Sequence, residues 1–467
     1  MFAKKNRNHE MNMCEGALLK KIIIYSLPLM ATNILQLLFN LADTVVLSQF
    51  SEEGVSAVGA VGSTTALINL IIGLFVGLSV GANVLVAKCV GEKNKEKSEK
   101  IVGMSILVSL IFGTILAIIG VFGARYFLIA MNCDKELLDM ATVYIRIYFF
   151  GMPIILLYNF VASILRAVGD TFRPLMYLII AGVINIFLNL FFVLVLHYDV
   201  EGVAIATVVS QVVSAILSII ALLKNKGYSH LNVKKIRIYK DEFIEMLKIG
   251  VPAGLQGCVF SISNVLIQSS INKFGKVVIS ANTVASQLDG FIYNAMNAVA
   301  LASLAFVSQN LGAGKLDRVK KVILESTAVV TVVGFIVAAI ILLFKRQLCG
   351  FFAPGDNEVI KIAVHRLNIM CTTYFLCGIM EVLSNSLRGI GKSTLAMIIS
   401  LSGSCFFRIL WLKTVCLKWT TLNAIYVVYP ISWVLTSLIL AVVVCVCFMK
   451  LKKTFAAKEV AIENNDL

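Results

Sequence analysis

The second half of this chain repeats the first half at a spacing of about 222 residues. Residues 165–170 read Leu-Arg-Ala-Val-Gly-Asp and return at 387–392 as Leu-Arg-Gly-Ile-Gly-Lys. The Leu-Pro pair at 27–28 returns in the same way as Val-Pro at 251–252. In a strongly apolar chain, a duplication of this size is typical of a membrane transporter built from two related helical bundles.

Composition indicates that the chain lies in a membrane. Hydrophobic residues make up 59% of it and charged residues only 14%, whereas soluble domains carry about 25% charge. A helix needs about 20 apolar residues to cross the hydrocarbon layer. Twelve runs meet that need, at about residues 22–48, 56–87, 101–124, 138–165, 173–196, 201–223, 244–272, 277–310, 322–344, 361–387, 394–416 and 423–449. We therefore predict an all-α polytopic membrane protein with twelve transmembrane helices.

The predicted helices divide evenly between the two repeats. Each half holds six, an even number, so both halves enter the membrane the same way round and form parallel repeats. We expect an N-lobe six-helix bundle at residues 22–223 and a C-lobe six-helix bundle at residues 244–449. A basic arm at 1–21, a basic linker at 224–243 and a tail at 450–467 complete the chain.

Positive charge is concentrated on one side of this predicted topology. Segments on the side of the N-terminus hold 29 of the 41 Lys and Arg residues. The positive-inside rule then places both termini in the cytoplasm, and we expect a multi-pass protein of the cell membrane. Topology and lipid contact account for the net charge of +15, so the charge does not require a nucleic-acid partner.

The sequence gives no support for an enzyme or a nucleotide-driven pump. It lacks GxxxxGK[ST] and HExxH, which support phosphate binding and hydrolysis. Its one GxSxG match, at residues 77–81, lies inside a long apolar run and not at a strand-to-helix turn. The eleven cysteines and four histidines show no metal-ligand spacing, and thiols in apolar runs fit a structural role. We expect no catalytic residue and no cofactor apart from a coupling ion.

Glycines mark one face of the second predicted helix. Gly73, Gly77 and Gly81 stand four residues apart. Because glycine has no side chain, this spacing leaves a groove along that face of the helix. Small residues at this spacing let membrane helices approach closely. We predict a helix-packing role for this groove and no chemistry.

Three carboxylates interrupt apolar runs, namely Asp43, Asp289 and Glu381. A charge at the bilayer centre costs about 2.5–3.5 kcal/mol on insertion scales. Acids in such positions usually face a bundle interior and act on ions or substrates. These three residues are therefore the strongest functional candidates.

Asp43 has a set of predicted polar neighbours. Four polar residues of the first run share one helical face: Asn33, Gln36, Asn40 and Asp43. Counting from the helix ends places Asn185, Asn189 and Thr207 at the depth of Asp43. Two readings follow, an ion-coupling site or a hydrogen-bonded cluster that only holds the bundle together.

The C-lobe has a comparable polar stripe along residues 277–310. It comprises Asn282, Ser286, Asp289, Tyr293 and Asn297. We predict that Asp289, Tyr293 and Glu381 face a cavity or the substrate, together with Gln36 and Asn40. The alternative for Asp289 is a structural ion pair with Arg408, which lies at a comparable predicted depth.

Several segments resemble the MATE (multidrug and toxic compound extrusion) family. They are Ser-Leu-Pro-Leu-Met-Ala-Thr-Asn-Ile-Leu-Gln from residue 26, Phe-Asn-Leu-Ala-Asp-Thr-Val from 39, Val-Gly-Glu-Lys-Asn from 90 and Leu-Arg-Ala-Val-Gly-Asp-Thr from 165. The resemblance covers residues 18–453. It implies two six-helix lobes around a V-shaped cavity, and export of organic cations and other amphiphiles by H⁺ or Na⁺ antiport with alternating access.

The resemblance also implies an N-lobe ion site. In the family, that site combines a helix-1 acid, an Asn-x-x-x-Asp pair and a Thr. Asp43, Asn185 and Thr207 match it, whereas Asn189 stands where the family often has the second acid. A single carboxylate favours H⁺ over Na⁺ at Asp43. We expect a monomer whose partners are the lipid bilayer and small amphiphilic molecules.

Two other classes of protein remain as alternatives. A lipid or lipid-linked oligosaccharide flippase of the same broader superfamily would also be helical and apolar. Such a flippase often keeps several arginines that face its cavity, whereas this sequence has only Arg408 as a plausible candidate. An intramembrane enzyme would need a nucleophile or a metal constellation, and the sequence shows none.

Overall fold

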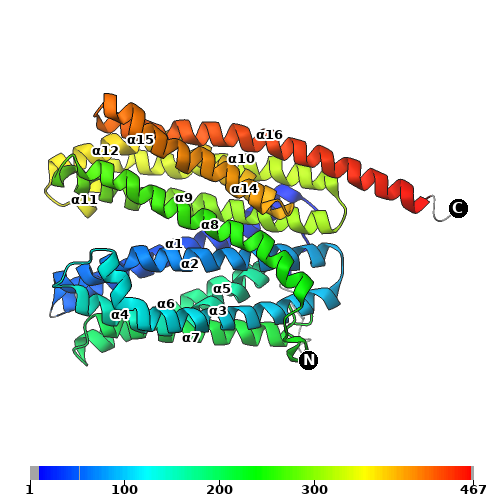
Figure 1. Cartoon of the computed structure of the whole chain (residues 1–467), viewed down its shortest axis with the longest axis horizontal. Coiled ribbons are helices and arrows are strands. Elements are labelled where there is room, and N and C mark those ends of the chain that lie inside the picture. The colour runs from blue at the N-terminus through cyan, green and yellow to red at the C-terminus, as the bar shows by residue number, and fades with distance from the viewer. Residues whose placement is uncertain (1–9, 52, 464–467) are drawn as a thin grey trace, which may run out of the picture. The chain divides into compact units, whose positions relative to one another are not determined.

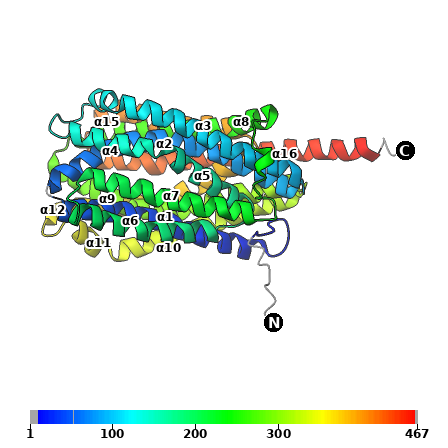
Figure 2. The same ribbon diagram turned by 90° about the horizontal axis from the view of Figure 1, so that it is seen from below.

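The protein is helical throughout the part of the chain that the structure describes. The computed structural model describes residues 10–51 and 53–463, which contain helices, turns and loops but no strand. Figures 1 and 2 show this all-helical architecture in two views. The predicted all-α class is confirmed.

Ten described helices are long and apolar enough to cross a membrane, and two bent helix pairs raise the number to as many as twelve. The first pair is α4 (Leu138–Phe150) with α5 (Met152–Ala167), bent by 51°. The second is α12 (Asn357–Cys371) with α13 (Tyr374–Gly389), bent by 48°. Pro153 at the start of α5 lacks a backbone N–H, so the helix ends and restarts there. The predicted twelve spans are reached when each bent pair counts as one span.

The chain packs into two compact units. Unit 1 comprises Met1–Asn12 and Ala31–Gly254, and unit 2 comprises Met13–Met30 and Leu255–Leu467. Of the three internal boundaries, the first follows Asn12, and the other two fall within the helices α1 (Leu18–Phe50) and α8 (Lys240–Asn272), just after Pro28 and Pro252. The lobes expected at 22–223 and 244–449 assign each of these helices whole to one lobe, so the observed units differ from them at both helices.

Unit 1 is built from the later part of α1, the start of α8 and the helices between them. These are α2 (Gly54–Gly91), α3 (Lys95–Ala130), α4, α5, α6 (Phe172–Leu194), α7 (Val200–Lys224) and the short helix η1 (Val233–Lys235). A Cβ on Gly77 would lie 2.2 Å from the backbone of Gly254, and one on Gly81 would lie 2.4 Å from Met246 O. The predicted packing role of Gly77 and Gly81 is therefore confirmed, whereas Gly73 has open space around it.

Unit 2 is organised around one long helix. It holds α9 (Lys276–Gly312), α10 (Leu316–Leu343), α11 (Lys345–Phe352), α12, α13, α14 (Ser393–Ser400), the π-helical turn η2 (Leu401–Phe406), α15 (Phe407–Lys418) and α16 (Leu422–Glu463). Helix α9 packs against α10, α12 and α13. The first part of α1 joins this unit, where the ring of Tyr25 meets that of Phe306 edge to face at 5.5 Å.

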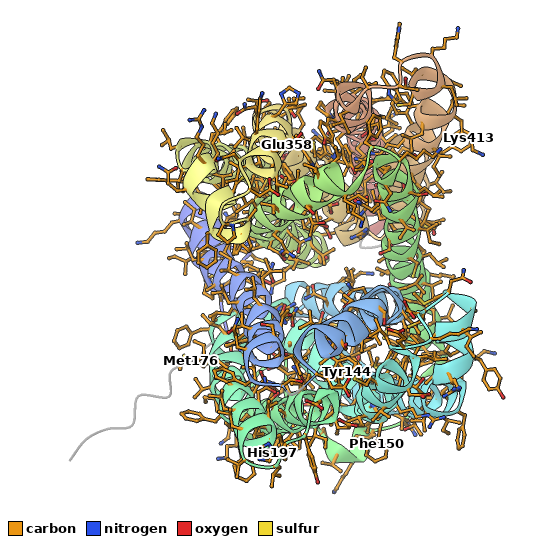
Figure 3. All side chains as sticks on the ribbon, turned by 90° about the vertical axis from the view of Figure 1, so that its left-hand side faces the viewer. Tyr144, Phe150, Met176, His197, Glu358 and Lys413 are labelled. Atoms are coloured by element: carbon orange, nitrogen blue, oxygen red, sulfur yellow. The ribbon has the colours of Figure 1, made fainter. Side chains whose placement is uncertain are left out.

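Large apolar side chains also cover the outside of the helices. Phe150 is 75% exposed and projects outward, whereas Tyr144 on the same helix is buried (Figure 3). An apolar exterior of this kind suits contact with lipid rather than water. The fold thus agrees with a multi-pass membrane protein.

Candidate functional site

Asp43 on α1 is hydrogen-bonded to α6 within unit 1. The amide Nδ2 of Asn189 donates to Asp43 Oδ1 at 2.5 Å and to Asn185 Oδ1 at 3.4 Å. Asn185 and Asn189 stand one turn apart on α6, so their side chains share a face. Asn189 is completely buried. The contact predicted from shared depth is therefore present.

Asp43 has neutral partners only. No Lys, Arg or His side chain forms an ion pair with it within residues 10–51 and 53–463. The Oδ1 atom of Asn189 is buried without a hydrogen-bond partner. Carboxylate and amide oxygens are hard ligands that suit a small cation, and a carboxylate also accepts a proton. The cluster can therefore change its charge at one group, Asp43.

The other predicted neighbours of Asp43 are less closely involved. The hydroxyl of Thr207 donates to Val203 O at 2.9 Å, within its own helix α7. Gln36 and Asn40 are both exposed on α1. Roles for these three residues in ion or substrate binding remain predictions.

Two tyrosines near Asp43 were missed in the sequence. The phenol groups of Tyr144 and Tyr148 on α4 interact electrostatically with Asp43, and their rings stack at 6.2 Å. Both carry a hydroxyl that can donate to a carboxylate. Their four-residue spacing within an apolar run is the signal that would have found them.

Asp289 on α9 has a charged partner within unit 2. Arg366 on α12 donates from Nη2 to Asp289 Oδ2 at 2.8 Å. The same guanidinium donates from Nη1 to Ser286 Oγ at 2.8 Å and to Asn282 O at 2.7 Å. Asp289 and Arg366 are both buried. This is a hydrogen-bonded ion pair between two helices.

The expected alternative pair of Asp289 with Arg408 is wrong. Arg408 instead donates from Nε to Ser432 Oγ at 2.9 Å and lies over the ring of Tyr429, 4.4 Å from its centroid. The π-helical turn η2 ends at Phe406, two residues before Arg408, so the helix is not regular there. Counting depth along straight helices therefore selected the wrong arginine.

Glu381 on α13 also lies near an arginine. It interacts electrostatically with Arg388, and Arg388 Nη1 donates to Asn385 Oδ1 at 3.1 Å. Tyr293 on α9 interacts electrostatically with Glu381. The structure thus brings Tyr293 and Glu381 together from two helices, while their cavity or substrate role remains a prediction.

Fold, duplication and an intramembrane acid define this chain as a polytopic membrane transporter of two related halves. The MatE family model matches residues 28–191 and 252–411, one segment in each half. The chain therefore belongs to the MatE family. Members of this family are transporters and not enzymes.

Named relatives and solved structures agree with this assignment. The chain is 27% identical over 390 residues to "Probable multidrug resistance protein YoeA" of Bacillus subtilis, covering 82% of this chain and 83% of that protein. It is 20% identical over 432 residues to "Multidrug export protein MepA" of Staphylococcus saprophyticus, covering 92% of both. A structure described as an outward-facing conformation of a multidrug resistance MATE family transporter matches with a TM-score of 0.88 at 22% identity. That match covers 94% of this chain and 98% of the other.

Proposed function

We propose that this protein exports amphiphilic organic cations from the cell by antiport with H⁺, through an alternating-access cycle. The names of its relatives support export of drugs as the general activity. The observation that carries the coupling mechanism is the Asp43 cluster. Asp43 is an intramembrane acid whose hydrogen-bond partner, Asn189, is neutral.

The charge of Asp43 supplies the coupling step. An ionised carboxylate is costly in a poorly hydrated site, and binding of H⁺ removes that cost. Conformations that differ in the hydration of Asp43 are then populated differently before and after protonation. Asn185 and Asn189 orient the carboxylate but cannot neutralise it. Inward movement of one proton across 100 mV supplies about 2.3 kcal/mol, and outward movement of one monovalent cation costs the same, so a one-for-one exchange is driven by the pH gradient.

H⁺ is favoured over Na⁺ because the cluster has one carboxylate. Its other oxygens are the neutral amide oxygens of Asn185 and Asn189. Na⁺ would need several of these oxygens to converge, whereas H⁺ needs only Asp43. The positive-inside distribution of Lys and Arg supports the proposal that both termini lie in the cytoplasm. We also propose that the transporter acts as a monomer.

A second candidate, a flippase for lipid-linked anions, is favoured by one observation. The described part of unit 2 buries three arginines, Arg366, Arg388 and Arg408, but only two acids, Asp289 and Glu381. Two of the arginines face those acids, which leaves only Arg408 for an anionic headgroup. Cation export therefore remains the better supported function.

The experiment compares two driving gradients in proteoliposomes. Export of a fluorescent organic cation is followed under a proton gradient without sodium, and under a sodium gradient at equal pH. We expect export with the proton gradient and its collapse with a protonophore. Uphill export that persists with both gradients abolished and ATP supplied would defeat the proposal. Movement of a phospholipid probe without any cation export would favour the flippase.

A further inference from the structure

Arg408 on α15 is a buried cation of unit 2. It is only 3% exposed and lies in a segment, Ser393–Lys418, that is long and apolar enough to cross a membrane. In the part of the chain that the structure describes, no Asp or Glu forms an ion pair with it. The two buried acids described in this unit interact with other arginines. A guanidinium keeps its charge at every physiological pH, so this charge needs another form of compensation.

The guanidinium of Arg408 uses one of its three nitrogens. Its Nε donates to Ser432 Oγ at 2.9 Å, and the group lies over the ring of Tyr429, 4.4 Å from the centroid. Both partners are neutral. Among the described residues, none accepts a hydrogen bond from Nη1 or Nη2. These two nitrogens form a planar fork that can bind an anion through two hydrogen bonds.

Three aromatic side chains near Arg408 add further donors. The ring centroid of Trp433 on α16 lies 5.0 Å from that of Tyr374 on α13 and 6.0 Å from that of Tyr429. Arg408 interacts electrostatically with both tyrosines, and Tyr374 and Trp433 are buried.

The polar groups of these rings lack protein acceptors. Within residues 10–51 and 53–463, no group accepts from the hydroxyl of Tyr374 or Tyr429 or from the indole N–H of Trp433. Buried tyrosines and tryptophans usually have such a partner. Two hydroxyls, an indole N–H and the guanidinium fork therefore gather in one region without a carboxylate. An anion is the ligand that accepts from all of them.

The packing of η2 and α15 on α16 holds Arg408 in place. Helices α15 and α16 lie side by side in unit 2 (Figure 1). A Cβ on Gly403 in η2 would lie 2.2 Å from Thr436 Oγ1, so glycine permits this close approach to α16. Thr436 stands one turn after Ser432, which accepts from Arg408. The donors thus stand on packed helices, and π-helical turns such as η2 are frequent at functional sites.

We propose that Arg408, Tyr374, Tyr429 and Trp433 form a binding site for one small monovalent anion. A single negative charge balances the single guanidinium and removes the cost of an unpaired buried cation. A dianion such as phosphate would instead leave one negative charge uncompensated. Chloride from solution and the carboxylate of a bound organic molecule share this chemistry. The proposal does not depend on cation export.

Anion titration of the unfolding temperature tests the site. The purified full chain in detergent is unfolded by heat while sodium chloride replaces sodium gluconate at constant ionic strength and pH. Gluconate is a bulky, strongly hydrated anion. An ion that binds only the folded protein raises the unfolding temperature until the site is saturated. In the second arm, sodium benzoate replaces gluconate in the same way.

We expect a saturable rise of the unfolding temperature of the wild type in at least one arm. A rise with chloride identifies an ion from solution, and a rise with benzoate alone identifies an organic carboxylate. Arg408→Gln should increase the dissociation constant of that anion at least about tenfold, because it removes charge-assisted hydrogen bonds. Arg346→Gln, at an exposed position on α11, is the control and should match the wild type.

Tyr429→Phe separates the donor role from ring packing, because it keeps the ring beneath the guanidinium and removes the hydroxyl. We expect it to raise the dissociation constant about threefold. An unfolding temperature of the wild type that responds to neither anion would overturn the site, as would an equal response of Arg408→Gln. If Arg408→Gln fails to fold, Tyr374→Phe combined with Tyr429→Phe decides, and unchanged affinity in that variant rejects the proposal. The measurement uses no substrate and no gradient, so its result is separate from that of the export experiment.

Discussion

Asp43 in unit 1 and Asp289 in unit 2 are the same residue type in comparable apolar surroundings, but their partners differ. Asp43 accepts a hydrogen bond from a neutral amide, Asn189. Asp289 accepts one from the guanidinium of Arg366. An acid beside a buried cation is held ionised, whereas an acid beside amides can gain or lose a charge. The comparison supports the proposal that Asp43 couples ion movement to transport, whereas Asp289 with Arg366 holds helices of unit 2 together.

The largest expected effect is on stability, from Asp289→Asn. This change leaves Arg366 buried without its counter-charge, and breaking a buried pair costs about 3–5 kcal/mol. We expect a clearly lower unfolding temperature in detergent, whereas Asp43→Asn should unfold close to the wild type. Adding Arg366→Gln to Asp289→Asn should recover part of the loss. Equal unfolding temperatures for Asp289→Asn and the wild type would show that the ion pair of Asp289 with Arg366 does not stabilise the protein.

Asn189→Asp should place a second carboxylate beside Asp43. Two adjacent acids cannot both be ionised without a compensating cation, and a second carboxylate improves an oxygen site for Na⁺. We expect export driven by a sodium gradient to rise about tenfold relative to export driven by a proton gradient. Unchanged ion preference in proteoliposomes would show that the single carboxylate does not select H⁺.

Asn189→Leu should have a moderate effect on both stability and coupling. It removes the hydrogen bonds to Asp43 and Asn185, and interhelical hydrogen bonds in membranes contribute about 0.6 kcal/mol on average. We expect a loss of about 1 kcal/mol in unfolding free energy, together with an altered pH dependence of export. Ser286→Ala is the matched test in unit 2, where export should keep its pH dependence because Arg366 still binds Asp289.

Tyr144→Phe and Tyr148→Phe should have the smallest effects. Each removes a hydroxyl near Asp43 and keeps the ring and its stacking. We expect changes of about twofold in export rate, since one neutral hydrogen bond contributes about 1 kcal/mol or less. A complete loss of export with normal expression would show that the substituted tyrosine takes part in coupling.

The sequence predicts most of the fold because apolar run length and repeat spacing are local properties of the chain. It also predicts the contact between Asp43 and Asn189, since both lie on helices without a strong bend at that depth. The pairing of Asp289 with Arg366 could not be predicted in this way, because depth counted along a straight helix shows neither the bend between α12 and α13 nor the face on which Arg366 lies. The division of α1 and α8 between the units is a tertiary property, and Pro28 and Pro252 mark its position without predicting it.

The most direct test of the central claim is cation export by Asp43→Asn at matched membrane expression. The variant keeps the shape of the side chain and an oxygen that accepts from Asn189, but it cannot carry the charge. Asp317→Asn, at an exposed position at the start of α10, is the control for the same chemical change. We predict that Asp43→Asn folds and loses proton-driven export, while Asp317→Asn exports normally. Wild-type export by Asp43→Asn would contradict the account and remove Asp43 from the mechanism.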